Sequence, residues 1–166
     1  MIDLFRKIAH RILDRRQVAP SRRDAQAYEK AGFVILGAHA RTDEGVLIPR
    51  APAIRIACDA PPEELGRAVR AVLAEYRDGV PHPQRWAGVG QDFLKATGLK
   101  SWRALMSGAR YCGIVEEPDG SISFEHYRQV SAKQFVPLGI PDRVLATGAP
   151  DDEVGAALLE ALAASE

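Results

Sequence analysis

The 166-residue sequence has only two cysteines, an aromatic content of 7% and a formal net charge of zero. Two cysteines do not make the disulfide framework that stabilises small secreted domains. No apolar run approaches the roughly 20 residues that a membrane-spanning helix needs. The opening stretch, MIDLFRKIAHRILDRR, also lacks the continuous apolar segment of a secretory signal peptide. We therefore expect a cytoplasmic protein without a membrane partner.

The chain has the length of one compact domain. At about 150 residues per domain, the sequence predicts a single hydrophobic core that needs neither a metal nor a disulfide for its stability. Within it we distinguish an N-terminal helical segment, residues 1–32, from an α+β domain, residues 33–166. Apolar residues at helical spacing predict a basic amphipathic helix over Ile2–Arg16.

Capping and turn signals predict the remaining elements. Ser21 as an N-cap, Asp24 three residues later and Gly32 as a stop signal predict a short helix over residues 21–31. Alternating or β-branched stretches predict strands near residues 33–36, 46–48, 54–58, 110–117, 122–127, 134–138 and 143–146. Amphipathic stripes predict helices near residues 61–76, 90–97, 102–107 and 151–164, and DGVPHP at 78–83 predicts a rigid loop. This order favours an α+β fold, with a mainly antiparallel sheet on which the helices pack.

Two segments of the chain resemble each other at an offset of 89 residues. Each predicts a strand, a short acidic turn and an amphipathic helix with an internal glycine, and the two segments are Ile54–Val69 and Arg143–Leu158. A glycine in a helix interior costs about 1 kcal/mol relative to alanine. Its repetition, as Gly66 and Gly155, therefore favours a shared packing geometry in which each helix approaches the sheet closely.

The sequence offers little that supports catalysis or a cofactor. Its four histidines lack the spacing of metal ligands, and neither cysteine belongs to a CxxC pair. His126 falls on an apolar strand face, which favours a core histidine over a ligand. The phosphate-binding, dinucleotide-binding and GxSxG motifs are also missing. We expect no enzyme, metal or cofactor, with a thiol enzyme built on Cys58 or Cys112 as a distant alternative.

Charge is unevenly distributed along the chain. Residues 1–50 carry a net charge of +4, residues 51–110 one of +3, and residues 111–166 one of −7. The acidic residues gather around the turn signal Pro118–Gly120, and those we select as candidate binding residues are Glu116, Glu117, Asp119 and Glu125. An exposed acidic hairpin of this kind attracts a basic partner and raises its association rate. The simpler interpretation is a solvated turn, with the charges mixed by folding.

A nucleic-acid-binding region is the alternative hypothesis. The pattern of residues 92–110 predicts two helices separated by a glycine turn, which is the arrangement of a helix-turn-helix motif. The basic residues in and near it are Arg85, Lys95, Lys100, Arg103 and Arg110. Both helices are short, however, and the pI of about 6.9 is below the value of about 9 that DNA-binding domains usually exceed.

The order of several short stretches resembles the family of bacterial contact-dependent growth inhibition (CDI) immunity proteins. These stretches are GVLIPRAPAIRI (45–56), EELGRAV (63–69), DGVPHP (78–83), LKATGLKSW (94–102), GAR (108–110), PDGSI (118–122) and DDEVGAALLEALAAS (151–165). They span about residues 33–166, so the basic N-terminal helix lies outside the resemblance. None of these stretches is a catalytic signature, and their order and spacing carry the likeness.

The resemblance implies a cytoplasmic inhibitor rather than an enzyme. Such a protein binds the C-terminal toxin domain of a cognate effector, with 1:1 stoichiometry as our expectation, and binds no nucleic acid itself. Many such toxins are nucleases, whose substrate-binding surfaces are basic. The acidic hairpin would then cover the active site or the substrate-binding site of the toxin. The zero net charge departs from a strongly acidic inhibitor and leaves open a contact of mixed character.

Overall fold

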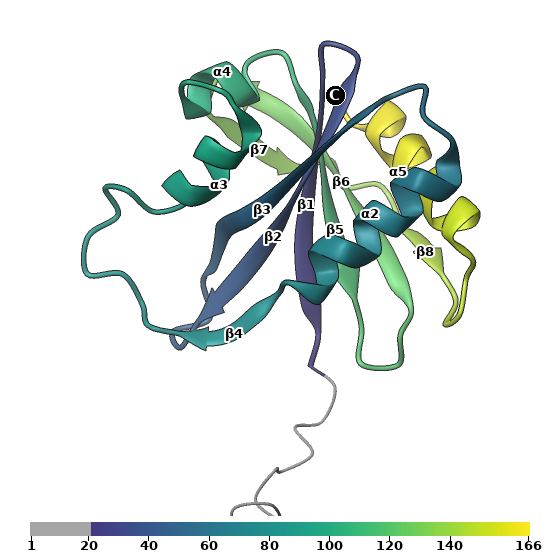
Figure 1. Ribbon diagram of the computed structural model, residues 1–166, viewed down its shortest axis with the longest axis horizontal. Helices are drawn as coiled ribbons and strands as arrows, with labels where there is room; N and C mark the ends of the chain where they lie inside the picture. Colours follow the sequence, from purple (N-terminus) through teal and green to yellow (C-terminus); the bar gives the residue numbers. More distant parts are fainter. Residues whose placement is uncertain (1–20) are drawn as a thin grey trace, which may run out of the picture.

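The computed structural model describes residues 21–166 (Figure 1). The helix predicted over Ile2–Arg16 lies outside these residues. The strands are β1 (Arg23–Lys30), β2 (Phe33–Thr42), β3 (Leu47–Ala57), β4 (Arg77–Val80), β5 (Arg110–Glu116), β6 (Ile122–Ser131), β7 (Gln134–Pro137) and β8 (Arg143–Leu145). The helices are α2 (Pro62–Ala74), α3 (Gln91–Thr97), α4 (Trp102–Met106) and α5 (Asp151–Ala164). Within this part of the chain, no helix is long and apolar enough to cross a membrane.

The strands form one eight-stranded sheet. Its order runs β3-β2-β1-β5-β6, and β6 then pairs with β8 over its first residues and with β7 over its last ones. Among residues 21–166, all strand pairs are antiparallel except β2–β4. This confirms the predicted α+β fold with a mainly antiparallel sheet. The rigid loop predicted over residues 78–83 is partly wrong, because β4 includes Asp78–Val80 and pairs with the end of β2.

The helix predicted over residues 21–31 is wrong, because this stretch forms β1 at the centre of the sheet. Alanine, glutamine, glutamate and lysine favour a helix over a strand when neighbours do not decide. Here β2 and β5 pair with β1 on its two sides and supply the hydrogen bonds of its backbone. Ala25 and Ala27 are buried in the main core, so the alternating Asp24 and Gln26 face the other side of the sheet.

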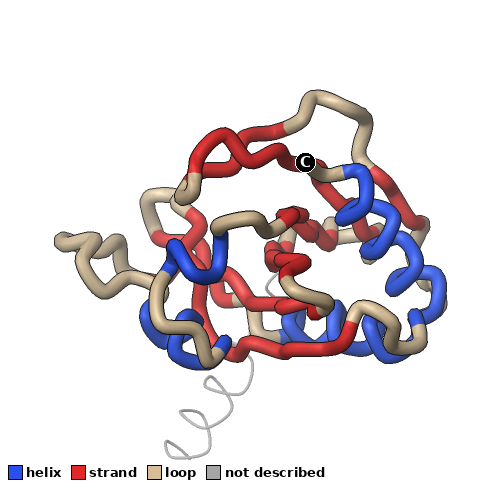
Figure 2. Tube along the Cα trace, turned by 90° about the horizontal axis from the view of Figure 1, so that it is seen from above, coloured by secondary structure: helices blue, strands red, loops and turns tan. Residues whose placement is uncertain are grey.

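Helices cover both faces of the sheet, and from above they fall into two groups on either side of the strands (Figure 2). α2 and α5 lie side by side over the main core, which includes Leu36, Val69 and Phe124. On the opposite face, α3 and α4 pack on a smaller aromatic cluster around Tyr28 and Phe93. These two short helices leave the part of that face near Asp24 uncovered, and polar side chains occupy it.

The repeated segments form two halves of the sheet that resemble each other. The order β3-β2-β1-β5-β6-β8 contains the same three-strand unit twice, each followed by a helix. The two units meet where β1 pairs with β5. There, Ala25 lies opposite Ile114, the residue that corresponds to it at the offset of 89. The two halves therefore meet about a pseudo-two-fold axis between β1 and β5.

The two helical glycines lie where α2 and α5 cross. A Cβ atom at Gly66 would lie 2.6 Å from the carbonyl carbon of Asp151, and one at Gly155 would lie 2.6 Å from that of Pro62. Asp151 and Pro62 are themselves separated by the same offset of 89 residues. The predicted close approach is thus confirmed at both glycines. The predicted partner, the sheet, is wrong, because each helix approaches the other helix.

Candidate functional site

The predicted hairpin turn forms between β5 and β6 and places three of the four selected carboxylates. The Glu117 N–H donates to the Ser121 carbonyl at 2.9 Å, and the Gly120 N–H donates to the Glu117 carbonyl at 2.8 Å. Gly120 has a φ of +84°, the left-handed conformation that favours glycine in a turn. Asp119 accepts hydrogen bonds from the hydroxyl and the N–H of Ser121, which lower the pKa of this exposed carboxylate. The turn is therefore held by its own polar groups.

Glu116 and Glu117 each lie near an arginine from the segment that leads into β1. Arg23 donates to the Glu116 carboxylate at 3.2 Å. A guanidinium nitrogen of Arg22 lies 3.7 Å from a carboxylate oxygen of Glu117, whose side chain is 43% exposed. Part of the acidity of the C-terminal third is thus neutralised by residues from the basic N-terminal third. Folding mixes the charged segments at this point, as the simpler interpretation of the charge pattern predicts.

Glu125 belongs to β6, which β5 separates from β1 in the sheet. Its register partner on β5 is Gly113, and a Cβ atom there would lie 2.7 Å from Oε2 of Glu125. The glycine therefore makes room for the carboxylate over the sheet. Tyr127 donates its hydroxyl hydrogen to Glu125 at 3.1 Å. Burial, with a further contribution from Glu125, raises the pKa of Tyr127 to about 12, so the phenol stays a hydrogen-bond donor at neutral pH.

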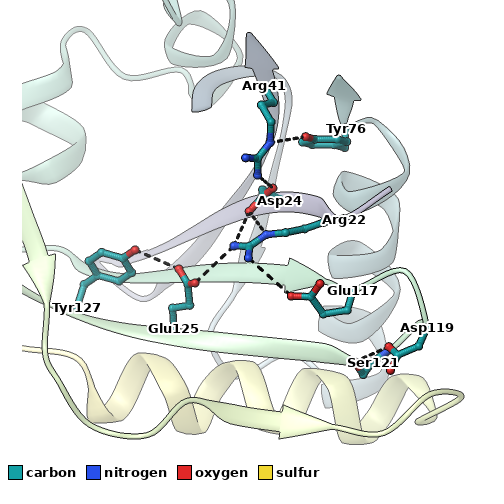
Figure 3. A network of polar contacts seen from close by, with 9 residues as sticks. All are labelled: Arg22, Asp24, Arg41, Tyr76, Glu117, Asp119, Ser121, Glu125 and Tyr127. Atoms are coloured by element: carbon teal, nitrogen blue, oxygen red, sulfur yellow. Dashed lines mark hydrogen bonds and ion pairs between the residues drawn. The ribbon is translucent and has the colours of Figure 1, made fainter. Parts of the chain in front are cut away.

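Asp24 is the centre of the polar contacts on this side of the sheet (Figure 3). Its side chain is 3% exposed and contacts two guanidinium groups, Arg22 at 3.2 Å and Arg41 at 2.9 Å. Arg41 also donates to the hydroxyl of Tyr76 at 3.1 Å. Because both bonds of Arg41 favour its charged form, they raise its pKa further, the bond to Tyr76 first. A buried carboxylate is costly unless it is paired, and these two arginines provide the pairing.

We call these side chains the polar sheet face; its members are Arg22, Asp24, Arg41, Glu117, Glu125 and Tyr127. A cavity of about 40 Å³ lies beside it, and His39 is part of its lining together with Asp24 and Glu125. His39 is 8% exposed, and its Nδ1 has no hydrogen-bond partner among residues 21–166. Burial lowers the pKa of His39 to about 4, so its imidazole is neutral at pH 7.

Three of the four residues selected from the sequence form ion pairs with arginines, and the fourth does not. Glu117 and Glu125 share Arg22, and Glu116 is bound by the neighbouring Arg23. Asp119 instead forms hydrogen bonds within its own turn. Sequence reasoning missed the other members of the site, which are Arg22, Asp24, Arg41, Tyr127 and His39. The alternation of polar and apolar residues in DAQAY was the signal that β1 would place Asp24 there.

The alternative region at residues 92–110 has exposed basic residues but short helices. Lys95, Lys100 and Arg103 are exposed, while α3 has seven residues and α4 has five. Phe93, Leu94 and Leu105 are buried against the sheet. A recognition helix must reach along a DNA groove with several side chains, and a five-residue helix is too short for that. Nothing in this geometry favours nucleic-acid binding.

The alternative thiol enzyme finds no support in the surroundings of the cysteines. Cys112 is buried in the main core, and burial raises its pKa well above the usual range, which leaves no reactive thiolate. His126 is its register partner on β6 and is 8% exposed, as expected for a core histidine. Cys58 is partly buried, and its pKa is also raised by burial. Within residues 21–166, no group of three or more His, Cys, Asp or Glu side chains is placed to hold a metal ion.

Comparisons with known proteins extend these observations. The family model described as CdiI, CDI immunity protein, matches residues 26–165. A protein of unknown function from Neisseria meningitidis has a similar structure, with a TM-score of 0.75 and 19% identity over 89% of this chain and 97% of the other. A CdiA-CT/CdiI toxin and immunity complex from Yersinia pseudotuberculosis gives a TM-score of 0.70 and 16% identity over 88% and 98%. At these identities the two structures show a shared fold, and comparison with curated proteins gives no match.

Proposed function

The chain belongs to the CDI immunity protein family, and from this premise we propose that it neutralises a nuclease toxin by covering its substrate-binding site. An immunity protein has a cognate toxin as its partner and acts by binding it. The solved toxin and immunity complex from Yersinia pseudotuberculosis supports a toxin domain as the partner here. We further propose a 1:1 complex, formed in the cytoplasm of the cell that makes this protein.

The observation that carries the proposal is the grouping of acidic side chains at one end of the β5–β6 hairpin. Glu116, Glu117 and Asp119 lie at this end. Arg22 links Glu125 to Glu117 (Figure 3). The nucleic-acid-binding surface of a nuclease is basic because it must attract phosphates. An acidic surface of this kind attracts the same side chains and competes with the nucleic acid for them.

Arginine neighbours moderate this acidic surface. Arg22 and Arg23 lie within 4 Å of three of the four carboxylates. The surface is therefore acidic but not strongly so, in agreement with the zero net charge of the chain. Exposed ion pairs contribute only about 0–1 kcal/mol each, so we expect steering by charge to set the association rate. The affinity itself then depends on buried contacts with the toxin.

A binding and inhibition experiment tests the proposal. The purified toxin domain encoded upstream is titrated with this chain by calorimetry, and cleavage of DNA and RNA by the toxin is measured at each ratio. We expect a 1:1 complex with a Kd of about 1 nM or below, which corresponds to about −12 kcal/mol, and loss of nuclease activity at equivalence. Tight binding with undiminished cleavage would contradict site coverage, and a folded toxin that does not bind would contradict the function itself.

A further inference from the structure

We propose that a lysine or arginine side chain of the toxin enters the polar sheet face and displaces Arg22 from Glu117 and Glu125. This inference rests on the function proposed above and specifies the chemistry of the contact. It assigns Arg22 the role of an internal competitor, which neutralises the acceptor site in the free protein and must move when the partner binds.

The contacts of Arg22 suit a side chain that can be displaced. Its distances to Glu117 and Glu125, 3.7 Å and 3.8 Å, are those of ion pairs without a close hydrogen bond. The Arg22 side chain is 44% exposed, so solvent screens these pairs and each contributes little. Among residues 21–166, Arg22 is also the only basic side chain within 4 Å of either carboxylate. A cation from the partner therefore competes with Arg22 for the same two carboxylates.

Displacement of Arg22 leaves the other contacts of Asp24 and Glu125 in place. Asp24 keeps its shorter contact with Arg41, at 2.9 Å. Glu125 keeps the hydroxyl of Tyr127 at 3.1 Å. The ion pairs of Arg22 with Glu117 and Glu125 are lost, together with its two hydrogen bonds to Oδ1 of Asp24 at 3.2 Å and 3.3 Å, and the incoming cation provides a new partner for that buried oxygen. The polar sheet face without Arg22 has one positive and three negative side chains, which favours an incoming cation.

A second feature points to a ligand at the same place. The cavity of about 40 Å³ beside the polar sheet face is lined by Asp24, Glu125 and His39. Nδ1 of His39 is buried and has no hydrogen-bond partner in the described part of the chain, although buried polar atoms almost always have one. A neutral imidazole adds an acceptor nitrogen to two carboxylates without repelling a cation. A cavity of this size accepts only the tip of a side chain, which matches an ammonium or a guanidinium group.

The test compares two variants that lose the same charge at different places. Arg22→Gln opens the polar sheet face, whereas Arg110→Gln removes an arginine of similar exposure, 50% against 44%, at the end of β5 away from the hairpin, where it pairs with Glu29. Association and dissociation rates with the toxin domain are measured by stopped flow or surface plasmon resonance at low and physiological salt. We expect Arg22→Gln to bind about three to ten times more tightly than Arg110→Gln.

A further variant separates a local effect from a general one. Adding Glu125→Gln to Arg22→Gln should cancel the gain, because the uncovered carboxylate is then gone. Equal affinity of Arg22→Gln and Arg110→Gln, or weaker binding by Arg22→Gln, would overturn the inference while leaving the proposed function standing. If the unmodified protein does not bind the toxin, the proposed function fails, and the inference fails with it. Unfolding midpoints close to that of the unmodified protein confirm that each variant is folded.

Discussion

Replacing Gly66 with alanine tests the close backbone approach between α2 and α5. In an open helix this change is favourable by about 1 kcal/mol, because alanine has the higher helix propensity. Here the new Cβ atom would lie 2.6 Å from the carbonyl carbon of Asp151, whereas carbon atoms prefer roughly 3.5–4.0 Å. The atoms in conflict belong to the backbone of α5, so no side-chain rotation relieves them. The carbonyl oxygen of Asp151 would be closer still, so the two helices must move apart.

The expected magnitude follows from these opposing effects. Overpacking of a well-packed core typically costs about 1–3 kcal/mol, and a clash with backbone belongs at the upper end of this range. After subtraction of the propensity gain, we expect Gly66→Ala to lower the free energy of unfolding by about 2 kcal/mol. For a domain of this size that corresponds to a fall in Tm of about 4–8 °C. Gly155→Ala, at the symmetric contact with Pro62, should have a similar effect.

Urea unfolding of four variants provides the assay. Ala71→Gly, at an exposed position of the same helix, measures helix propensity alone and should cost about 1 kcal/mol. The double variant of both glycines should cost less than the sum of the single ones, because one separation of the helices relieves both clashes. An increase in stability with Gly66→Ala, equal in size to the loss with Ala71→Gly, would refute the close approach.

Three other predictions concern charge, pH and thiol reactivity. Glu117→Lys combined with Asp119→Lys should slow association with the toxin several-fold at low salt and less at high salt; unchanged rates in a folded double variant would exclude the hairpin as a steering surface. His39 has a pKa of about 4 in the folded protein and 6.5 when unfolded, so the unfolded state takes up a proton first as pH falls. Stability should therefore decrease by about 2 kcal/mol between pH 7 and pH 4.5, and in urea titrations His39→Gln should remove this part of the pH dependence. Cys112, buried with a raised pKa, should react with a thiol reagent only on unfolding, whereas the partly exposed Cys58 should react slowly in the native protein; equal rates would contradict the buried position of Cys112.

Local patterns predicted those elements whose residues agree with their environment. The hairpin at Pro118–Gly120 has turn chemistry, and α2 has a proline and two acidic residues in its first turn, so both appear where expected. β1 was missed because its residues favour a helix, and its strand conformation comes from β2 and β5. β4 was missed because it has four residues and includes a glycine. In both cases the information lies in the pairing partners of the strand rather than in its own residues.

The candidate site was only partly predictable for the same reason. The acidic residues around the turn are neighbours in sequence, so their grouping was expected. Arg22 reaches Glu125, and Arg41 reaches Asp24, only because β1 lies between β2 and β5. With β1 interpreted as a helix, neither the two arginines nor the buried carboxylate had a reason to lie there. The repeated glycine was noticed because it recurs, but the sequence did not show that the partner was the other helix.

The position of β1 also has a consequence for how this protein is made. One side of β1 pairs with β2, which follows directly, but the other side waits for β5, and Glu116 comes 93 residues after Arg23. At a synthesis rate of about 5–20 residues per second, a nascent chain carries β1, β2, β3 and α2 for several seconds before β5 exists. During this time one edge of the central strand and the surface of α2 that α5 will cover are open to aggregation. The second half of the chain therefore protects the first half from aggregation, because the open edge of β1 and the exposed surface of α2 are covered only when β5 and α5 have emerged.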